Sequence, residues 1–195
     1  MDSLHGQPPQ LWTALSAAAL SLSGCCTLFP STCPPPTTAC VDFDDLTAGQ
    51  NVAAGTAFSS RNTVIALEPF QRGNGTWTGG NHARVDNRQY AGGSNLDINA
   101  NNVNLHFLPD CPVDRVTLRF GELGGNNNLR INGQFSNIAN LVTVNGTTLG
   151  GVQISVTANQ QGNNWYGTMS FDGQISDFAI GGQELWLDDV CFRRP

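Results

Sequence analysis

The chain has 195 residues, of which 12% are charged, and its formal net charge at neutral pH is −6. Its basic side chains are nine arginines and three histidines, without a single lysine. Proteins that bind nucleic acids or anionic membrane surfaces usually gather Lys and Arg on one face. The composition therefore argues against both kinds of partner, and the length suits one domain with a substantial core.

An apolar run from Leu11 to Leu22 ends in the sequence Leu22-Ser23-Gly24-Cys25. This end resembles the lipobox of bacterial lipoproteins, in which the cysteine becomes the lipidated first residue of the mature chain. The resemblance implies an export signal over residues 1–24, lipidation at Cys25 and an extracytoplasmic location in the cell envelope, lipid-anchored or secreted. The alternative is a buried helix over the same run, which is shorter than the ~20 residues of a membrane span.

A spacer is expected over residues 25–39. This segment is rich in Pro and Thr and contains Pro34-Pro35-Pro36. Consecutive prolines favour an extended and stiff backbone. We therefore expect a tether that holds a single globular domain, residues 40–195, away from the membrane.

Short segments with a period of two recur from Cys40 onward. Three examples are Val116–Phe120, Val152–Val156 and Trp165–Phe171, each with one apolar and one polar face. Such alternation is typical of half-buried antiparallel strands. Many short strands without a helical period predict an all-β fold, and we expect an antiparallel β-sandwich.

Glycine and asparagine separate these segments. We expect the following glycine pairs to lie at strand ends, where turns need a positive φ: Gly79-Gly80, Gly92-Gly93, Gly124-Gly125, Gly150-Gly151 and Gly181-Gly182. Asn132-Gly133 and Asn145-Gly146 are dipeptides that favour type I′ hairpin turns. Leu129–Val144 is accordingly expected to be a hairpin or meander.

Six cysteines in a chain of this size, without zinc-type spacing, favour an oxidising compartment. The first predicted strand begins at Cys40 and the last predicted strand ends near Cys191. If these strands pair antiparallel, the two cysteines lie close enough for a disulfide. Cys111 then pairs with Cys33 or stays free, and four cysteines allow three connectivities.

The two terminal strands, Val41-Asp-Phe-Asp-Asp and Leu185-Trp-Leu-Asp-Asp-Val190, resemble those of bacterial jelly-roll modules. Carbohydrate-binding modules and galactose-binding-like domains share this pattern. The resemblance implies a jelly-roll β-sandwich and a structural calcium. Its ligands would be Asp42, Asp44, Asp188 and Asp189. In the alternative interpretation, alternate residues of each acidic pair simply face solvent.

Catalytic motifs are missing from the sequence. It contains no G-x-S-x-G elbow, no HExxH helix and no phosphate loop. Carboxylate chemistry needs only two acids about 5 to 10 Å apart, and Glu122 and Glu184 are the candidates for such a pair. His106 lies within an apolar strand, where a structural role is the better interpretation. Catalysis is therefore the minority hypothesis.

Aromatic and arginine side chains indicate a ligand-binding face. Flat rings can stack on sugars while arginines bond carboxylates or sulfates, which favours an acidic polysaccharide. The candidate residues are Trp77, His82, Arg84, Arg88, Tyr90, Trp165 and Tyr166. The alternatives are that the arginines pair with local acids and that the tryptophans fill the core.

The expected function is therefore binding of a polysaccharide or another envelope glycan, without chemistry, by a protein similar to a carbohydrate-binding module. A structural or adhesive envelope protein is the alternative. A carboxylate-dependent polysaccharide hydrolase or lyase is the third hypothesis.

Overall fold

The computed structural model describes residues 37–195. The predicted export signal, the lipidation site Cys25, Cys33 and most of the tether lie outside these residues. The described part contains 14 strands in one antiparallel sheet and one short 3₁₀ helix. The all-β prediction is therefore confirmed.

The elements follow one another along the chain with short connections. The strands are β1 (Thr38–Val41), β2 (Asn51–Ala53), β3 (Ala57–Ser60), β4 (Thr63–Gln71), β5 (Trp77–Thr78), β6 (His82–Asp86), β7 (Asp97–Asn101), β8 (Val103–Leu108), β9 (Val113–Ile131), β10 (Gln134–Ile138), β11 (Thr148–Leu149), β12 (Val152–Gln161), β13 (Asn164–Ile175) and β14 (Phe178–Arg193). The 3₁₀ helix η1 (Leu141–Val144) lies between β10 and β11. The three segments in which alternation was strongest lie within β9, β12 and β13.

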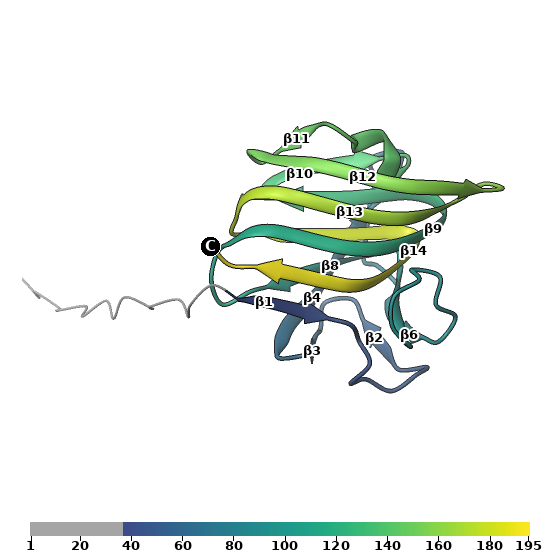
Figure 1. Cartoon of the computed structure of the whole chain (residues 1–195). Helices are drawn as coiled ribbons and strands as arrows, with labels where there is room; N and C mark the ends of the chain where they lie inside the picture. The colour runs from purple at the N-terminus through teal and green to yellow at the C-terminus, as the bar shows by residue number, and fades with distance from the viewer. Residues whose placement is uncertain (1–36) are drawn as a thin grey trace, which may run out of the picture. The chain divides into compact units, whose positions relative to one another are not determined.

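The last strand, β14, is the centre of the sheet (Figure 1). It pairs with β9 along one edge and with β8, β7 and β1 in turn along the other. Only Asn102, whose φ is 53°, separates β7 from β8. The sheet branches there, because β8 continues to β4 and β3 whereas β7 continues to β6 and β2.

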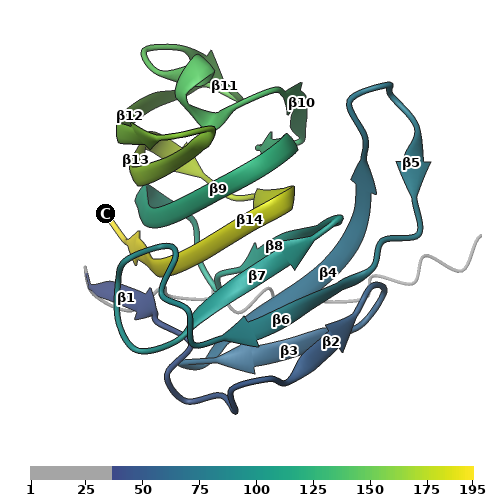
Figure 2. The same ribbon diagram turned by 90° about the vertical axis from the view of Figure 1, so that its right-hand side faces the viewer.

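Both sides of β14 contribute to one core. Figure 2 shows β9, β13 and β12 stacked on one side of β14, with β8, β4, β7 and β6 on the other side at an angle to them. The Phe178 ring of β14 lies 5.0 Å from Phe171 of β13 and 6.0 Å from Phe107 of β8. All three rings are fully buried. The sheet thus folds over a single core, and a jelly-roll connectivity within it stays a prediction.

Two turn predictions have different outcomes. Asn132 and Gly133 have φ values of 50° and 76° and join β9 to β10, so the predicted hairpin is confirmed. The hairpin predicted at Asn145-Gly146 is wrong. Asn145 has φ −60° and ψ 128° and Gly146 has φ 76°, which is a type II turn that follows η1.

The prediction that every glycine pair ends a strand is also wrong, because Gly124-Gly125 lies inside β9 and Gly181-Gly182 inside β14. A Cβ on Gly181 would overlap the Val103 carbonyl oxygen and approach Asn104 Oδ1 to 2.5 Å. Glycine is therefore required in β14 so that β8 can lie close to it.

The predicted bond between Cys40 and Cys191 is present. The two residues are directly opposite each other in β1 and β14, with their Cα atoms 3.9 Å apart. Cys111 is also disulfide-bonded, and its predicted partner, Cys33, lies outside the described residues. Disulfide bonds form and persist in oxidising compartments, so these two bonds indicate such a compartment for this chain. From residue 37 onward, the chain forms no helix with the length and apolar character of a membrane span.

Replacing both Cys40 and Cys191 by serine should lower the free energy of unfolding by about 3 to 5 kcal/mol, since the bond closes a loop of 151 residues. Urea denaturation followed by circular dichroism measures this change. The double variant is preferable to a reducing agent, which would also break the bond of Cys111. A loss below about 1 kcal/mol would contradict the stabilisation that we attribute to this bond.

Candidate functional site

A cavity of about 510 Å³ opens where the β4–β5 hairpin faces β9 and β10. We call it the aromatic cleft. Its lining comes from β4, β5, β8, β9, β10 and β14. The lining residues are Glu68, Pro69, Trp77, Asn104, Asn128, Arg130, Phe135 and Ala179. Of the predicted ligand-binding residues, Trp77 is the one that belongs to it.

One wall of the aromatic cleft is formed by two rings. Trp77 is 53% exposed, and its ring centroid lies 5.1 Å from that of Phe135 at an interplanar angle of 41°. The alternative that the tryptophans fill the core therefore fails for Trp77. It holds for Trp186, which is buried, and partly for Trp165, which packs against the core. An exposed indole held by a second ring is a ready surface for an apolar ligand face.

The β4–β5 hairpin is held to β9 by a side-chain amide. Backbone pairing of β4 with β8 ends at Pro69, which has no N–H to donate. Two residues later, Asn128 Nδ2 donates to the Gln71 carbonyl at 2.9 Å, and the Gln71 N–H donates to Asn128 Oδ1 at 2.7 Å. The Asn128 amide thus replaces a backbone partner, and it is itself buried.

Further amides converge on the same point. Asn126 Nδ2 and Asn137 Nδ2 also donate to the Gln71 carbonyl, at 3.0 and 3.1 Å. Asn137 Nδ2 lies 2.8 Å from the Arg72 carbonyl. These bonds fix the base of the hairpin that carries Trp77, so the aromatic wall has a rigid support.

Two residues of the lining, Glu68 and Arg130, belong to a cluster of charged groups. Arg130 donates to both Glu68 oxygens, at 2.5 and 3.1 Å, and to both Asp177 oxygens, at 2.9 and 3.2 Å. His106 lies between the same carboxylates, with Nδ1 2.8 Å from Glu68 and Nε2 2.9 Å from Asp177. Both of these contacts are hydrogen bonds only when the imidazole carries two protons.

The electrostatic result is a neutralised cation. The hydrogen bonds that Arg130 donates to Glu68 are the main cause that raises the pKa of Arg130. Burial opposes ionisation of Asp177, but hydrogen bonds from Arg130 and from the Gly133 N–H hold the pKa of that carboxyl below its usual value. Arg130 is the only basic residue in the lining. The aromatic cleft therefore offers amide, carboxylate and aromatic groups but no unpaired positive charge.

The remaining predicted ligand-binding residues lie elsewhere. His82 and Arg84 are on β6, beyond the branch point of the sheet, and Trp165 and Tyr166 are on β13. None of these four lines the aromatic cleft.

Arg88 and Tyr90 occupy the loop after β6 and are likewise absent from the lining. Arg88 lies 3.6 Å from Asp86, as the local-pairing alternative proposed. The Tyr90 ring packs edge-on against Trp186 with centroids 4.9 Å apart. The arginine and aromatic side chains between residues 61 and 90 therefore do not form one common ligand-binding face.

The two carboxylates considered for catalysis have different surroundings. Glu122 is only 1% exposed and accepts hydrogen bonds from Asn127 Nδ2 at 2.8 Å and from the Leu141 N–H at 3.0 Å. Burial raises its pKa. Glu184 is exposed. Glu122 therefore anchors the start of η1 inside the protein, where no polysaccharide reaches it.

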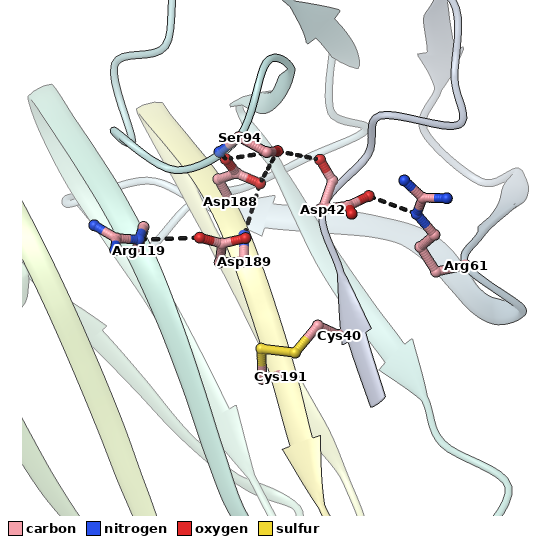
Figure 3. Close-up of a disulfide and its surroundings, with 8 residues drawn as sticks. All are labelled: Cys40, Asp42, Arg61, Ser94, Arg119, Asp188, Asp189 and Cys191. Carbon is pink, nitrogen blue, oxygen red and sulfur yellow. Dashed lines mark hydrogen bonds and ion pairs between the residues drawn. A yellow bond between two sulfur atoms is a disulfide. The ribbon is translucent and has the colours of Figure 1, made fainter. Parts of the chain in front are cut away.

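Asp42, just after β1, and Asp188, in the neighbouring β14, lie on either side of Ser94 (Figure 3). Asp188 accepts the Ser94 N–H at 2.5 Å, and Ser94 Oγ lies 3.0 Å from the Asp42 carbonyl. Asp42 bonds Arg61 at 2.7 Å (Figure 3).

The other two aspartates of the predicted calcium site also have protein partners. Asp189 bonds Arg119 at 3.0 Å, and Asp44 accepts the Leu96 N–H at 2.8 Å. Within residues 37–195, no group of three or more His, Cys, Asp or Glu side chains is arranged to hold a metal ion. Calcium binding by these aspartates stays a prediction.

Two buried acids, Asp188 itself and the nearby Asp97, have raised pKa values. Burial raises the pKa of Asp97 and of Asp188 to about 6 in each case. Between the unfolded value near 3.8 and about 6, the folded chain holds protons that the unfolded chain releases. Hydrogen bonds to the Leu96 N–H and to Asn95 outweigh burial at Asp44 and lower its pKa, so its stabilisation is lost only below about pH 4.

The free energy of unfolding should therefore rise by about 1 to 3 kcal/mol as the pH falls from about 7 to about 5. Asp97→Asn should remove roughly half of this rise, since one of the two proton sites is lost. Chemical denaturation at several pH values measures both effects. Asp110→Asn, at an exposed acid, is the matched control. An unchanged slope in Asp97→Asn would contradict the assignment.

Asn128→Asp should destabilise the fold by about 1 to 3 kcal/mol, because a carboxylate accepts the Gln71 N–H but cannot donate to the Gln71 carbonyl. Thermal and urea unfolding measure the change. Asn163→Asp, in the exposed β12–β13 turn, is the matched control and should have little effect. Equal effects of the two substitutions would argue against the amide anchor.

Comparison of the chain with known protein families, with curated proteins and with solved structures finds no match. The candidate function consequently depends on the chemistry of the aromatic cleft.

Proposed function

We propose that this chain binds a glycan in the aromatic cleft, without chemical turnover, as an exported protein of the cell envelope. One observation carries the proposal. Trp77 is an exposed aromatic ring on an anchored hairpin, next to a cavity lined by buried asparagine amides. Sugars need this combination of a flat apolar surface and fixed polar groups.

The size and lining of the aromatic cleft suit a sugar residue. Its volume of about 510 Å³ is in the range of small-molecule sites. The indole of Trp77 can stack on the C–H face of a pyranose ring. Asn128 and Glu68 also line the cavity and bring polar groups to it. Since the hairpin is already fixed by Asn128, little conformational entropy is lost on binding.

The charges favour a neutral glycan over the acidic polysaccharide expected from the arginines. Arg130 is bonded by two carboxylates, and Arg61 and Arg88 pair with aspartates outside the aromatic cleft. A uronic acid or a sulfate would meet Glu68 without an unpaired guanidinium to offset the repulsion. Neutral hexoses carry no such cost.

The position of the aromatic cleft supports display to the outside. In Figure 2, β1 and the C-terminus lie on one side of the molecule, and β5 lies on the opposite side. A lipid anchor at Cys25 would connect to the domain through residue 37, next to β1. Strand β5, which carries Trp77, lies on the side of the domain opposite β1 (Figure 2).

Trp77→Ala should weaken binding to a neutral polysaccharide at least thirtyfold, because truncating a central aromatic contact typically costs about 2 kcal/mol or more. The measurement is retention of the full exported chain on neutral and uronic-acid polysaccharides, followed by isothermal titration with oligosaccharides. Each assay is made with calcium and with EDTA. Loss of binding in EDTA would support a role for the terminal aspartates.

Two controls make the result specific. Trp77→Phe keeps an aromatic surface and should retain much of the binding, whereas Tyr166→Ala removes a ring outside the aromatic cleft and should change nothing. No retention on any polysaccharide would overturn the proposal in favour of a structural or adhesive role. Release of new reducing ends would instead favour the hydrolase or lyase hypothesis.

A further inference from the structure

Among residues 37–195, strand β12 has a free edge. Nine of its ten residues, Gln153 to Gln161, pair with β13 on one side. On the other side, β11 covers only Val152 and Gln153, and the turn before β11 bonds Ile154. In the part of the chain that the structure describes, the other strands with an open edge have at most five residues.

The unpaired backbone groups are identified by the register. The β12–β13 hairpin turns at Gly162-Asn163, so odd-numbered residues of β12 bond β13 and even-numbered residues point outward. The outward N–H of Val156 already donates to Asn145 Oδ1 at 2.8 Å. Three residues therefore have outward backbone groups without a partner among residues 37–195. These groups are the Val156 carbonyl and the N–H and carbonyl of Ala158 and of Gln160.

Nothing in the sequence of β12 protects this edge. Exposed edges are normally guarded by charged residues, proline or a bulge. The strand reads Val-Gln-Ile-Ser-Val-Thr-Ala-Asn-Gln-Gln, without a charge, a proline or a glycine, and its pairing with β13 is regular throughout. Val156 and Ala158 are half-buried on the core side, so a further strand would cover them.

We propose that this edge is an interface for a second copy of the same chain, with the two β12 strands antiparallel about a twofold axis at Ala158. When two copies of one strand pair antiparallel, each residue of one copy lies opposite a residue of the same strand in the other copy. Like charges at such opposite positions would repel each other, so a strand that forms this pair must not carry them. β12 meets this condition. The proposal is independent of glycan binding.

The register follows from the open groups alone. With Ala158 opposite its own copy, the two Ala158 residues exchange two backbone hydrogen bonds. Each Gln160 N–H then donates to the Val156 carbonyl of the other copy, which adds two more. No group already bonded within the chain is needed, and the sheets of both copies become continuous. The small contact area predicts weak and reversible association.

Sedimentation equilibrium of the full exported chain tests the proposal. The wild-type chain should change from monomer to dimer as its concentration rises. Ala158→Pro removes only an outward N–H, so it should abolish dimerisation while the thermal midpoint stays near that of the wild type. A wild-type chain that stays monomeric at the highest concentration reached overturns the proposal.

A charge pair provides the matched control. In the proposed register, position 157 of one copy lies opposite position 159 of the other. Thr157→Lys with Asn159→Lys places like charges opposite each other and should weaken association at least tenfold relative to wild type. Thr157→Lys with Asn159→Glu changes the same positions but pairs opposite charges, so it should dimerise at least as well as wild type. Equal dimerisation of the two double variants would place the interface elsewhere and overturn the proposal.

Discussion

Backbone pairing on both edges of β14 is the constraint on which the rest of the structure depends. This strand pairs with β9 from Phe178 to Arg193, with three register shifts, and with β8, β7 and β1 in sequence on its other edge. The two ends of β14 consequently contribute to two different regions of the molecule. The aromatic cleft lies near its start, where Gly181 lets β8 approach, and the aspartates and the disulfide lie near its end.

Side-chain amides act where backbone pairing stops. Pro69 ends the ladder between β4 and β8, and the chain beyond it would have unsatisfied carbonyls close to β9. Asn128 supplies a donor and an acceptor to Gln71 in the geometry of a missing strand neighbour. The β4–β5 hairpin that carries Trp77 is therefore held in place by the side-chain amide of Asn128. This is one use of the many asparagines in this chain.

The sequence predicted features that depend on local pattern. Alternation located β9, β12 and β13, and the likeness of the two terminal strands identified the Cys40–Cys191 bond, because antiparallel pairing leaves one register for two cysteines at opposite strand ends. Trp77 was found, but the lining residues Asn104, Arg130 and Phe135 were missed. They come from β8, β9 and β10, and no local signal records which distant strands meet. The run of three asparagines from 126 to 128 was the available hint.

The position of the disulfide also has a mechanical consequence. The described chain enters the fold at residue 37, and Cys40, near the start of β1, is joined covalently to Cys191 in β14. A pull applied at residue 37 therefore passes into the central strand through a sulfur–sulfur bond. The backbone between these two cysteines lies inside a closed covalent loop and is not stretched by that load. A force applied between residue 37 and the C-terminus would therefore load the sulfur–sulfur bond before it unravelled any strand between the two cysteines.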